Sequence, residues 1–238
     1  GVIVPSTHSK DSLKKTSKEG LELLIEPDVV AFPTARVLDQ SLNVDSELYN
    51  LLKERKREFN FLTVAQVSPR KNIFNLIKWF LKSQGNNPNV SLTLKIHKRD
   101  CSTIDYHNTF KSISSFVREM APHKECGINL LHGDLSTVEM GMLYQSDLFT
   151  HYITTTHGEG FGLPIFDAAS AGLVVVAPNW SGQSDYLDPE SSPKKLFTPI
   201  RFKVENVQES ATWPGVINED ASWAHVGEKD FKEAINFL

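Results

Sequence analysis

Two cations stand side by side in the loop formed by residues 66–72, between an apolar run and a helical pattern. These are Arg70 and Lys71. A guanidinium fork and an ammonium group beside a helix N-terminus form a clamp for an anion such as a diphosphate. An adjacent Arg and Lys in a surface turn are more often only solvated, so it is the position of this pair after an expected strand that favours anion binding.

A second loop is rich in glycine and precedes another helical pattern. Its residues are His157, Gly158, Glu159, Gly160, Phe161, Gly162 and Leu163. Glycines let backbone N–H groups approach a ligand closely, and the helix that follows offers its positive end to an anion. Glu159 and Asp167, eight residues apart, are expected to face one pocket and accept hydrogen bonds from hydroxyl groups. The pattern predicts a phosphate or polyhydroxyl ligand, and a glycine-rich turn with a solvated Glu159 is the alternative.

A third loop, residues 178–185, follows the apolar run 173–177. Trp180 is expected to line or cap the site, and Ser181 and Gly182 to donate hydrogen bonds to a phosphate. His157 has two interpretations that the sequence leaves open, contact with the ligand or a structural role at a strand end. His8 is expected only to decorate the first helix.

Helical and strand patterns alternate from residue 59 onward. The expected strands are 59–65, 90–97, 128–131, 148–153 and 173–177, and the expected helices are 72–83, 105–120, 136–145 and a helix after Pro164. Repeated strand–helix units predict an α/β, Rossmann-like, doubly wound parallel sheet with helices on both faces. Because such sheets bind ligands at the carboxyl ends of their strands, the three loops are expected to meet there.

The composition is that of a globular domain. The 238 residues are 40% hydrophobic and 23% charged, with a net charge of −4. An acidic balance argues against nucleic-acid binding, and no apolar run reaches the ~18 residues of a membrane span. Cys101 and Cys126 are too few for a disulfide framework and point to a cytoplasmic protein. The histidines show no metal-ligand spacing, so no metal is expected.

Together these motifs resemble the retaining GT-B glycosyltransferases of the family 4 type. The run FLTVAQVSPRKN resembles the first strand and loop of their C-terminal domain, usually close to F-x-x-V-G-R-x-x-x-x-K, with Lys71 at the lysine. HGEGFGLPIFDAASAGLVVVAP resembles their E-x7-E segment, and NWSGQSDYL resembles the loop that follows it. VIVPSTHSKDSLKK resembles the last strand and helix of their N-terminal domain.

The resemblance implies a binding site for a nucleotide sugar, with UDP, GDP or ADP as the nucleotide. Lys71, helped by Arg70, would bind the diphosphate, Glu159 would lie near the transferred sugar, and Asp167 would bind the ribose hydroxyls. Backbone groups of residues 160–163 would hold the sugar and phosphate. The implied reaction transfers the sugar to an acceptor hydroxyl with retention of configuration, and it uses no cofactor and usually no catalytic metal.

The resemblance also divides the chain. Residues 1–36 would be the end of an N-terminal acceptor domain and a linker, with a boundary near Pro33. Residues 37–238 would be the donor-binding domain with a C-terminal helical segment, in which Trp213, Trp223 and Phe231 are expected to pack. Since the chain starts at Gly1 and stops inside a helical pattern, we expect a fragment that lacks most of its acceptor domain and is inactive alone.

Two positions depart from the family pattern. Asp167 stands where the second glutamate is usual, which keeps the acceptor on a shorter side chain. Gln66 stands where arginine is usual, so either Arg70 compensates for the lost cation or donor binding is weaker. These departures keep open a non-catalytic nucleotide- or sugar-binding domain derived from such an enzyme. A nucleotide-sugar epimerase and a relative of glycogen phosphorylase are further alternatives on the same architecture.

Overall fold

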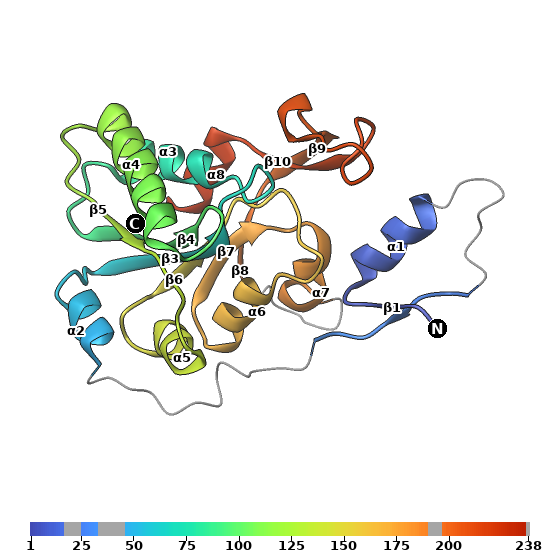
Figure 1. The fold of residues 1–238 in the computed structure, drawn as a ribbon, viewed down its shortest axis with the longest axis horizontal. Helices are drawn as coiled ribbons and strands as arrows, with labels where there is room; N and C mark the ends of the chain where they lie inside the picture. The colour runs from blue at the N-terminus through green and yellow to red at the C-terminus, as the bar shows by residue number, and fades with distance from the viewer. Residues whose placement is uncertain (17–24, 33–45, 190–196, 237–238) are drawn as a thin grey trace.

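The centre of the molecule is a six-stranded parallel sheet (Figure 1). A computed structural model describes residues 1–16, 25–32, 46–189 and 197–236. The strands are β3 (Phe59–Gln66), β4 (Val90–His97), β5 (Gly127–Leu131), β6 (His151–Ile153), β7 (Val174–Pro178) and β8 (Phe197–Ile200). They lie in the order β5-β4-β3-β6-β7-β8. This order confirms the predicted Rossmann-like, doubly wound sheet.

Helices cover both faces of this sheet (Figure 1). On one face lie α3 (Ile73–Gln84), α4 (Thr103–Met120) and α8 (Glu228–Ala234), and on the other lie α2 (Glu47–Lys53), α5 (Thr137–Gln145) and α6 (Leu163–Ser170). Neighbouring residues of a strand point to opposite faces. Phe61 and Leu62 of β3 therefore enter two separate hydrophobic cores, each fully buried. Among the helices that the structure describes, none has the length and apolarity needed to cross a membrane.

Most expected elements agree with the structure to within a few residues, with two differences near the site. Strand β6 is shorter than the expected 148–153, because Leu148 lies in a turn after α5, from which Leu148 and Phe149 enter the core. Helix α6 includes Pro164, which the sequence placed before the helix. Proline fits the first turn of a helix because its missing N–H has no partner within the helix there.

The N-terminal residues form a small unit of their own. β1 (Ile3–Val4) pairs in parallel with β2 (Asp28–Val29), and α1 (Thr7–Thr16) follows β1, which agrees with the expected strand and helix. The unit contacts the main domain through Thr7, whose N–H donates to Asp185 Oδ2 at 2.7 Å. The expected domain boundary at residues 36 and 37, and Pro33, lie outside the described residues.

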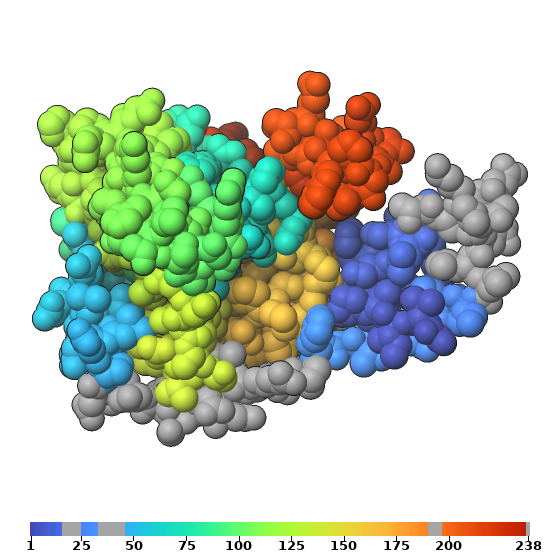
Figure 2. All heavy atoms as spheres, viewed as in Figure 1, coloured from blue at the N-terminus to red at the C-terminus, as the bar shows by residue number. Residues whose placement is uncertain are grey.

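The C-terminal segment starts as a hairpin rather than a helix. β9 (Phe202–Asn206) pairs antiparallel with β10 (Ser222–Val226), and only then does α8 follow. Trp223 and Phe231 are buried, as expected. The expectation for Trp213 was wrong, because this residue lies in a tight turn closed by Ile217 and is 64% exposed. In Figure 2 the hairpin (orange-red) and the N-terminal unit (blue) both lie beside the gold surface that includes α6.

Candidate functional site

The site lies where the chain changes direction across the sheet. β3 and β6 are neighbours, and the chain builds β4 and β5 on one side before it crosses to β6 on the other. Such a switch point leaves a crevice between the loops at the carboxyl ends of the two strands. Here the two loops touch, since the His157 N–H donates to the Arg70 carbonyl at 2.8 Å. The structure therefore confirms that these two predicted loops meet.

Both predicted cations bind the predicted carboxylate. Lys71 Nζ lies 2.6 Å from Glu159 Oε1, and Arg70 Nη1 lies 2.8 Å from Glu159 Oε2. The Thr156 hydroxyl donates to Glu159 Oε1 at 2.8 Å. The Glu159 side chain is only 8% exposed. The alternative of a solvated Glu159 in a simple turn is therefore wrong.

The electrostatics of this cluster favour the ionised carboxylate. Burial by itself raises the pKa of Glu159, but the positive charges of Lys71 and Arg70 and their hydrogen bonds outweigh that effect. The pKa of Glu159 is therefore below its usual value. The two cations carry one more positive charge than this single carboxylate neutralises. The cluster can thus attract a further anion.

Two residues with left-handed backbone conformations shape the loops that carry this cluster. Asn72, just before α3, has a left-handed φ of 55°, and its side-chain amide donates to the Thr155 carbonyl at 3.3 Å. Asparagine tolerates this conformation better than most residues. Gly162, just before α6, has a φ of 88°, which favours glycine. The turn at Gly162 brings the N-terminal end of α6 close to Lys71, because Pro164 and Lys71 line one small cavity.

The loop at residues 178–185 holds the glycine-rich loop in place through hydrogen bonds to the Glu159 backbone. Ser181 Oγ accepts a hydrogen bond from the Glu159 N–H at 2.8 Å, and the Gly182 N–H donates to the Glu159 carbonyl at 3.0 Å. A Cβ at position 182 would lie 2.1 Å from the Gly160 carbonyl oxygen, so the contact requires glycine. The sequence predicted donation from Ser181 and Gly182 to a phosphate. In the structure both groups hold the Glu159 loop. Donation to a phosphate would cost the Gly182 N–H its bond to the Glu159 carbonyl and the Ser181 hydroxyl its bonds to the Trp180 carbonyl and Gln183 Oε1, whereas Ser181 Oγ could still accept from the Glu159 N–H.

His157 is held by the C-terminal hairpin. Its Nδ1 lies 2.5 Å from the Ala224 carbonyl oxygen, and its ring stacks on Trp223 with centroids 4.6 Å apart. The side chain is buried, and this burial lowers its pKa. These contacts fit the structural role at a strand end, and contact with a ligand stays a prediction, because His157 also lines a cavity together with Glu159 and Trp180. Because β10 supplies both partners, the hairpin positions the loop that carries Glu159.

A cavity of about 430 Å³ lies on one side of the ionic cluster. Its lining residues come from α1, from the three loops and from β10, and include His8, Ser9, Arg70, Glu159, Trp180 and Trp223. Trp180 thus lines the site as predicted. The expectation that His8 only decorates a helix was wrong, because its ring packs edge-on against Trp180 at 5.2 Å. The two residues in this contact lie far apart in the sequence, so no local sequence pattern predicts it.

A second cavity of about 200 Å³ lies at the carboxyl ends of β3 and β4. It is lined by Gln66, Lys71, Lys95 and His97 among others. Lys95 was missed in the sequence, although a lysine inside the expected strand 90–97 was a signal. Lys95 Nζ donates to the Gly133 carbonyl at 2.6 Å, and burial lowers its pKa. Gln66 is exposed, and its amide donates to the Lys98 carbonyl at 3.3 Å.

The remaining predicted site residues belong to the loop at residues 157–163. The Gly158 carbonyl accepts from the Arg70 guanidinium, and the Gly160 carbonyl accepts from the Ser6 hydroxyl at 2.6 Å. Phe161 is buried, whereas Leu163, in the first turn of α6, is 46% exposed.

Asp167 lies farther along α6 and is half-buried. It does not line the larger cavity, so the expectation that Glu159 and Asp167 face one pocket fails there. Burial raises the pKa of Asp167 to about 6. Within the described ranges, no three His, Cys, Asp or Glu side chains come together as metal ligands.

Comparison with known proteins adds to this geometry. No protein-family model and no curated protein matches the chain. Among solved structures, HepE of Anabaena in complex with UDP-glucose has a TM-score of 0.55 and 18% identity, over 77% of this chain and 46% of that one. The GtfA/B complex has a TM-score of 0.54 and 16% identity, over 99% of this chain and 38% of that one. The pneumococcal O-GlcNAc transferase GtfA, in complex with UDP and GlcNAc, has a TM-score of 0.51 and 15% identity.

The similarity to these structures establishes the fold. At identities of 15–18%, it supports the Rossmann-like architecture and leaves the activity to be argued from the site. This chain spans less than half the length of each of the three proteins, at 46%, 38% and 36%.

Proposed function

We propose that this chain binds a nucleotide-sugar donor and forms the donor-binding part of a retaining glycosyltransferase of the GT-B type. The observation that carries this proposal is the cluster of Lys71, Arg70 and Glu159 at the switch point of the sheet, beside the first turn of α6. Support comes from two proteins that share the fold, because HepE is described with UDP-glucose and GtfA with UDP and GlcNAc.

The two cavities suit the two ends of such a donor. In the proposal the diphosphate binds Lys71, Arg70 and the N–H groups of residues 160–163. The nucleoside extends toward the smaller cavity, where Gln66 lies, and Asp167 accepts hydrogen bonds from the ribose hydroxyls. The sugar extends toward Glu159 in the larger cavity, whose aromatic rings include Trp180. Aromatic faces and a carboxylate are groups that pack against and hydrogen-bond to a sugar.

The reaction in this proposal depends on charge stabilisation. The bond between the anomeric carbon and the phosphate oxygen breaks, and the leaving diphosphate takes the bonding electron pair. Lys71 and Arg70 stabilise the negative charge that develops there. The acceptor hydroxyl attacks the same face of the sugar, which retains the configuration, and its proton passes to a phosphate oxygen. The proposal includes no cofactor besides the substrate.

The acceptor would bind a domain that precedes this chain in a longer protein. The small unit of β1, α1 and β2 lies against the loops of the site, as the end of such a domain would. We therefore propose that the 238-residue chain binds the donor but does not transfer the sugar by itself. A cytoplasmic location is part of the proposal, because Cys101 and Cys126 are both free.

A thermal-shift panel with UDP, GDP, ADP and their glucose conjugates tests the proposal. A ligand at about 100 times its dissociation constant stabilises a protein by about 2.7 kcal/mol, which means several degrees for a chain of this size. We expect a shift with one nucleotide, abolished in Lys71→Ala and retained in Lys111→Ala, which removes an exposed lysine from α4. A folded chain that shifts with none of these compounds would contradict the proposal.

A second candidate function, a nucleotide-sugar-binding domain without catalysis, is favoured by one observation. Gln66 lies on the smaller cavity beside Lys71, where the resembling family has a third cation. If the site has lost catalysis, donor binding persists while the longer protein that contains the acceptor domain shows no transfer. Transfer by that longer protein, lost in Lys71→Ala, would exclude this candidate.

A further inference from the structure

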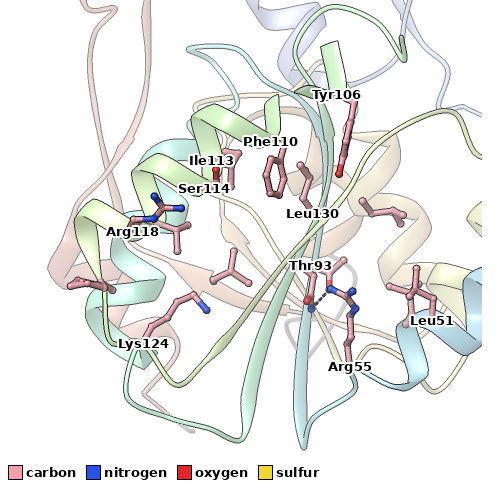
Figure 3. A pocket seen from close by; sticks show the side chains of 17 residues that line it. Leu51, Arg55, Thr93, Tyr106, Phe110, Ile113, Ser114, Arg118, Lys124 and Leu130 are labelled. Atoms are coloured by element: carbon pink, nitrogen blue, oxygen red, sulfur yellow. Dashed lines mark hydrogen bonds between the residues drawn. The ribbon is translucent and has the colours of Figure 1, made fainter. Parts of the chain in front are cut away.

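The sheet has an open edge on the side away from the site. Within the described ranges β5 pairs with β4 alone, and all five of its residues are half-buried. Every second residue of an edge strand directs its N–H and C=O groups outward, where another strand can bind them. A groove of about 670 Å³ runs along this edge (Figure 3).

Helices form the two walls of this groove. α4 contributes a stripe of residues at every fourth position, namely Tyr106, Phe110, Ser114 and Arg118. Residues four apart lie on one face of a helix. The aromatic members are unusually accessible, with Phe110 50% and Tyr106 40% exposed. The opposite wall, from the region of α2, includes Leu51.

The groove has chemically different ends. Tyr106 lies at the carboxyl end of β5, because its ring is 5.6 Å from the ring of His132, the residue after the strand. Lys124 lies at the amino end, three residues before the strand begins, and Arg118 lies toward the same end. Figure 3 shows the aromatic side chains at one end of the groove and these two cations at the other.

We infer that the occupant of this groove is a second copy of the same chain. Its β5 pairs antiparallel with this β5 around a two-fold axis near Asn129. Under this symmetry, positions at equal distances before and after Asn129 face each other across the axis. Lys124 and Asp134, each three residues beyond an end of the strand, then meet at both ends of the paired strands. Asp134 is exposed, and its Oδ1 accepts a hydrogen bond from Cys101 Sγ at 2.9 Å, so Oδ2 is left for this contact. Lys124 Nζ donates to the Cys126 carbonyl at 3.0 Å and has two further N–H groups for Asp134.

The stripe on α4 fits the same symmetry. The small Ser114, in the middle of the stripe, meets its counterpart near the axis and lets the two helices approach. Arg118 of each copy then lies against Phe110 of the other, in a cation–π contact. A parallel pairing of the two β5 strands would instead place Lys124 of one copy beside Lys124 of the other. The groove also contains Arg55, so an acidic peptide could pair with its three cations but would leave Asp134 without a cation, whereas a second copy pairs Lys124 with Asp134 at both ends.

The oligomeric state of the 238-residue chain tests this inference. We expect sedimentation velocity to show a monomer–dimer equilibrium between about 1 and about 100 µM, because a dimer follows mass action. Ser114→Arg places two cations at the axis and should leave a folded monomer. The matched control is Ser115→Arg, since Ser115 is exposed on the same helix outside the groove, and this variant should still dimerise. A wild-type chain that stays monomeric, or a dimer that Ser114→Arg does not weaken, would overturn the inference.

A charge exchange tests the register. Lys124→Glu and Asp134→Lys should each weaken the dimer several-fold, because each places like charges opposite each other twice in the dimer. The double variant should restore dimerisation, with circular dichroism confirming that every variant is folded. A double variant no better than the two single variants would contradict the pairing around Asn129. Neither residue belongs to the ionic cluster, so nucleotide binding remains a separate readout.

Discussion

At the scale of single residues, Glu159 determines how the cations of the site are used. It binds Lys71 and Arg70 at 2.6 and 2.8 Å, so a diphosphate must compete with this carboxylate for both. The same carboxylate is the group proposed to contact the sugar. A ligand that contains both a diphosphate and a sugar can bind the two cations with its phosphates. Its sugar hydroxyl groups can then donate hydrogen bonds to Glu159, which replace the lost ion pairs. A nucleoside diphosphate without the sugar cannot make that exchange.

Glu159→Gln should therefore bind UDP alone more tightly than the wild-type chain does. A hydrogen bond to a charged group contributes about 1.5–3 kcal/mol, so a gain of about ten-fold in affinity is expected when the competing charge is removed. Isothermal calorimetry measures it, with Glu119→Gln, an exposed position on α4, as the control. Unchanged or weaker UDP binding would show that Glu159 does not compete with the phosphates.

Asp167 should destabilise the fold near neutral pH. Its pKa in the folded chain is about 6, above the ordinary value of 3.8, so the folded state holds the proton more tightly than the unfolded state. The free energy of unfolding must then fall as the pH rises from about 4 to about 6. Asp167→Asn should raise the melting temperature at about pH 7.5 and change it little at about pH 4. The exposed Asp220→Asn is the control. Equal effects at the two pH values would contradict the raised pKa.

The sequence predicted the identity of these residues better than their contacts. Lys71, Arg70 and Glu159 stood out because they follow expected strands, and the rule for parallel sheets brought their loops together. The ion pairs join residues 88 and 89 positions apart in the sequence. The place of His8 in the larger cavity depends on packing between segments that are farther apart, such as Ser9 and Gly160, which are separated by 151 positions. Such contacts leave no periodic signal in the chain.

At the scale of elements, a few tightly packed residues hold the three loops of the site in contact. Gly182 packs directly against the Gly160 carbonyl, and Ser181 and Gly182 hold the backbone of Glu159 from both sides. The loop that carries Glu159 is thus fixed by the element that follows β7. β10 fixes the same loop through His157.

Gly182→Ala should therefore displace the loop that carries Glu159 and destabilise the fold. The added Cβ would lie 2.1 Å from the Gly160 oxygen, and overpacking of this kind costs about 1–3 kcal/mol. Chemical denaturation measures the loss of stability. Gly160→Ala is the matched control, because a Cβ there meets no atom within 4 Å and should cost much less. Equal stability of the two variants would contradict the close approach of the loops.

The elements with strong periodicity were predictable, and the hairpin was not. Strand β4 alternates apolar and polar residues along its whole length, and β3 contains the mostly apolar run at residues 59–65, so both gave clear signals. Strand β9 alternates apolar and polar residues over only five positions, so its pattern is too short to distinguish it from an extended loop, and four of the five residues are exposed. The hairpin forms because β10 contacts the site loop and α8 packs on the core, which are tertiary effects.

At the scale of the whole molecule, the sheet order decides where the chemistry lies. The alternation of strands and helices predicted a parallel sheet, and the structure places β3 and β6 at its centre. That order brings the cations after β3 against the carboxylate after β6, with the N-terminal unit closing the larger cavity. The far edge at β5 is left for the pairing inferred above. The proposed donor site and the inferred pairing surface thus lie at the centre and at one edge of the sheet, respectively.

The measurement that tests the central claim most directly is calorimetric titration of UDP, GDP and ADP into the wild-type chain, Lys71→Ala and Lys111→Ala. We predict that the wild-type chain binds one of these nucleotides and that Lys71→Ala loses at least about ten-fold in affinity for it, since a charge-assisted contact to the diphosphate is removed. Lys111→Ala should bind like the wild type. A folded wild-type chain that binds none of the three, or equal binding by Lys71→Ala, would contradict a nucleotide-sugar donor site at the junction of β3 and β6.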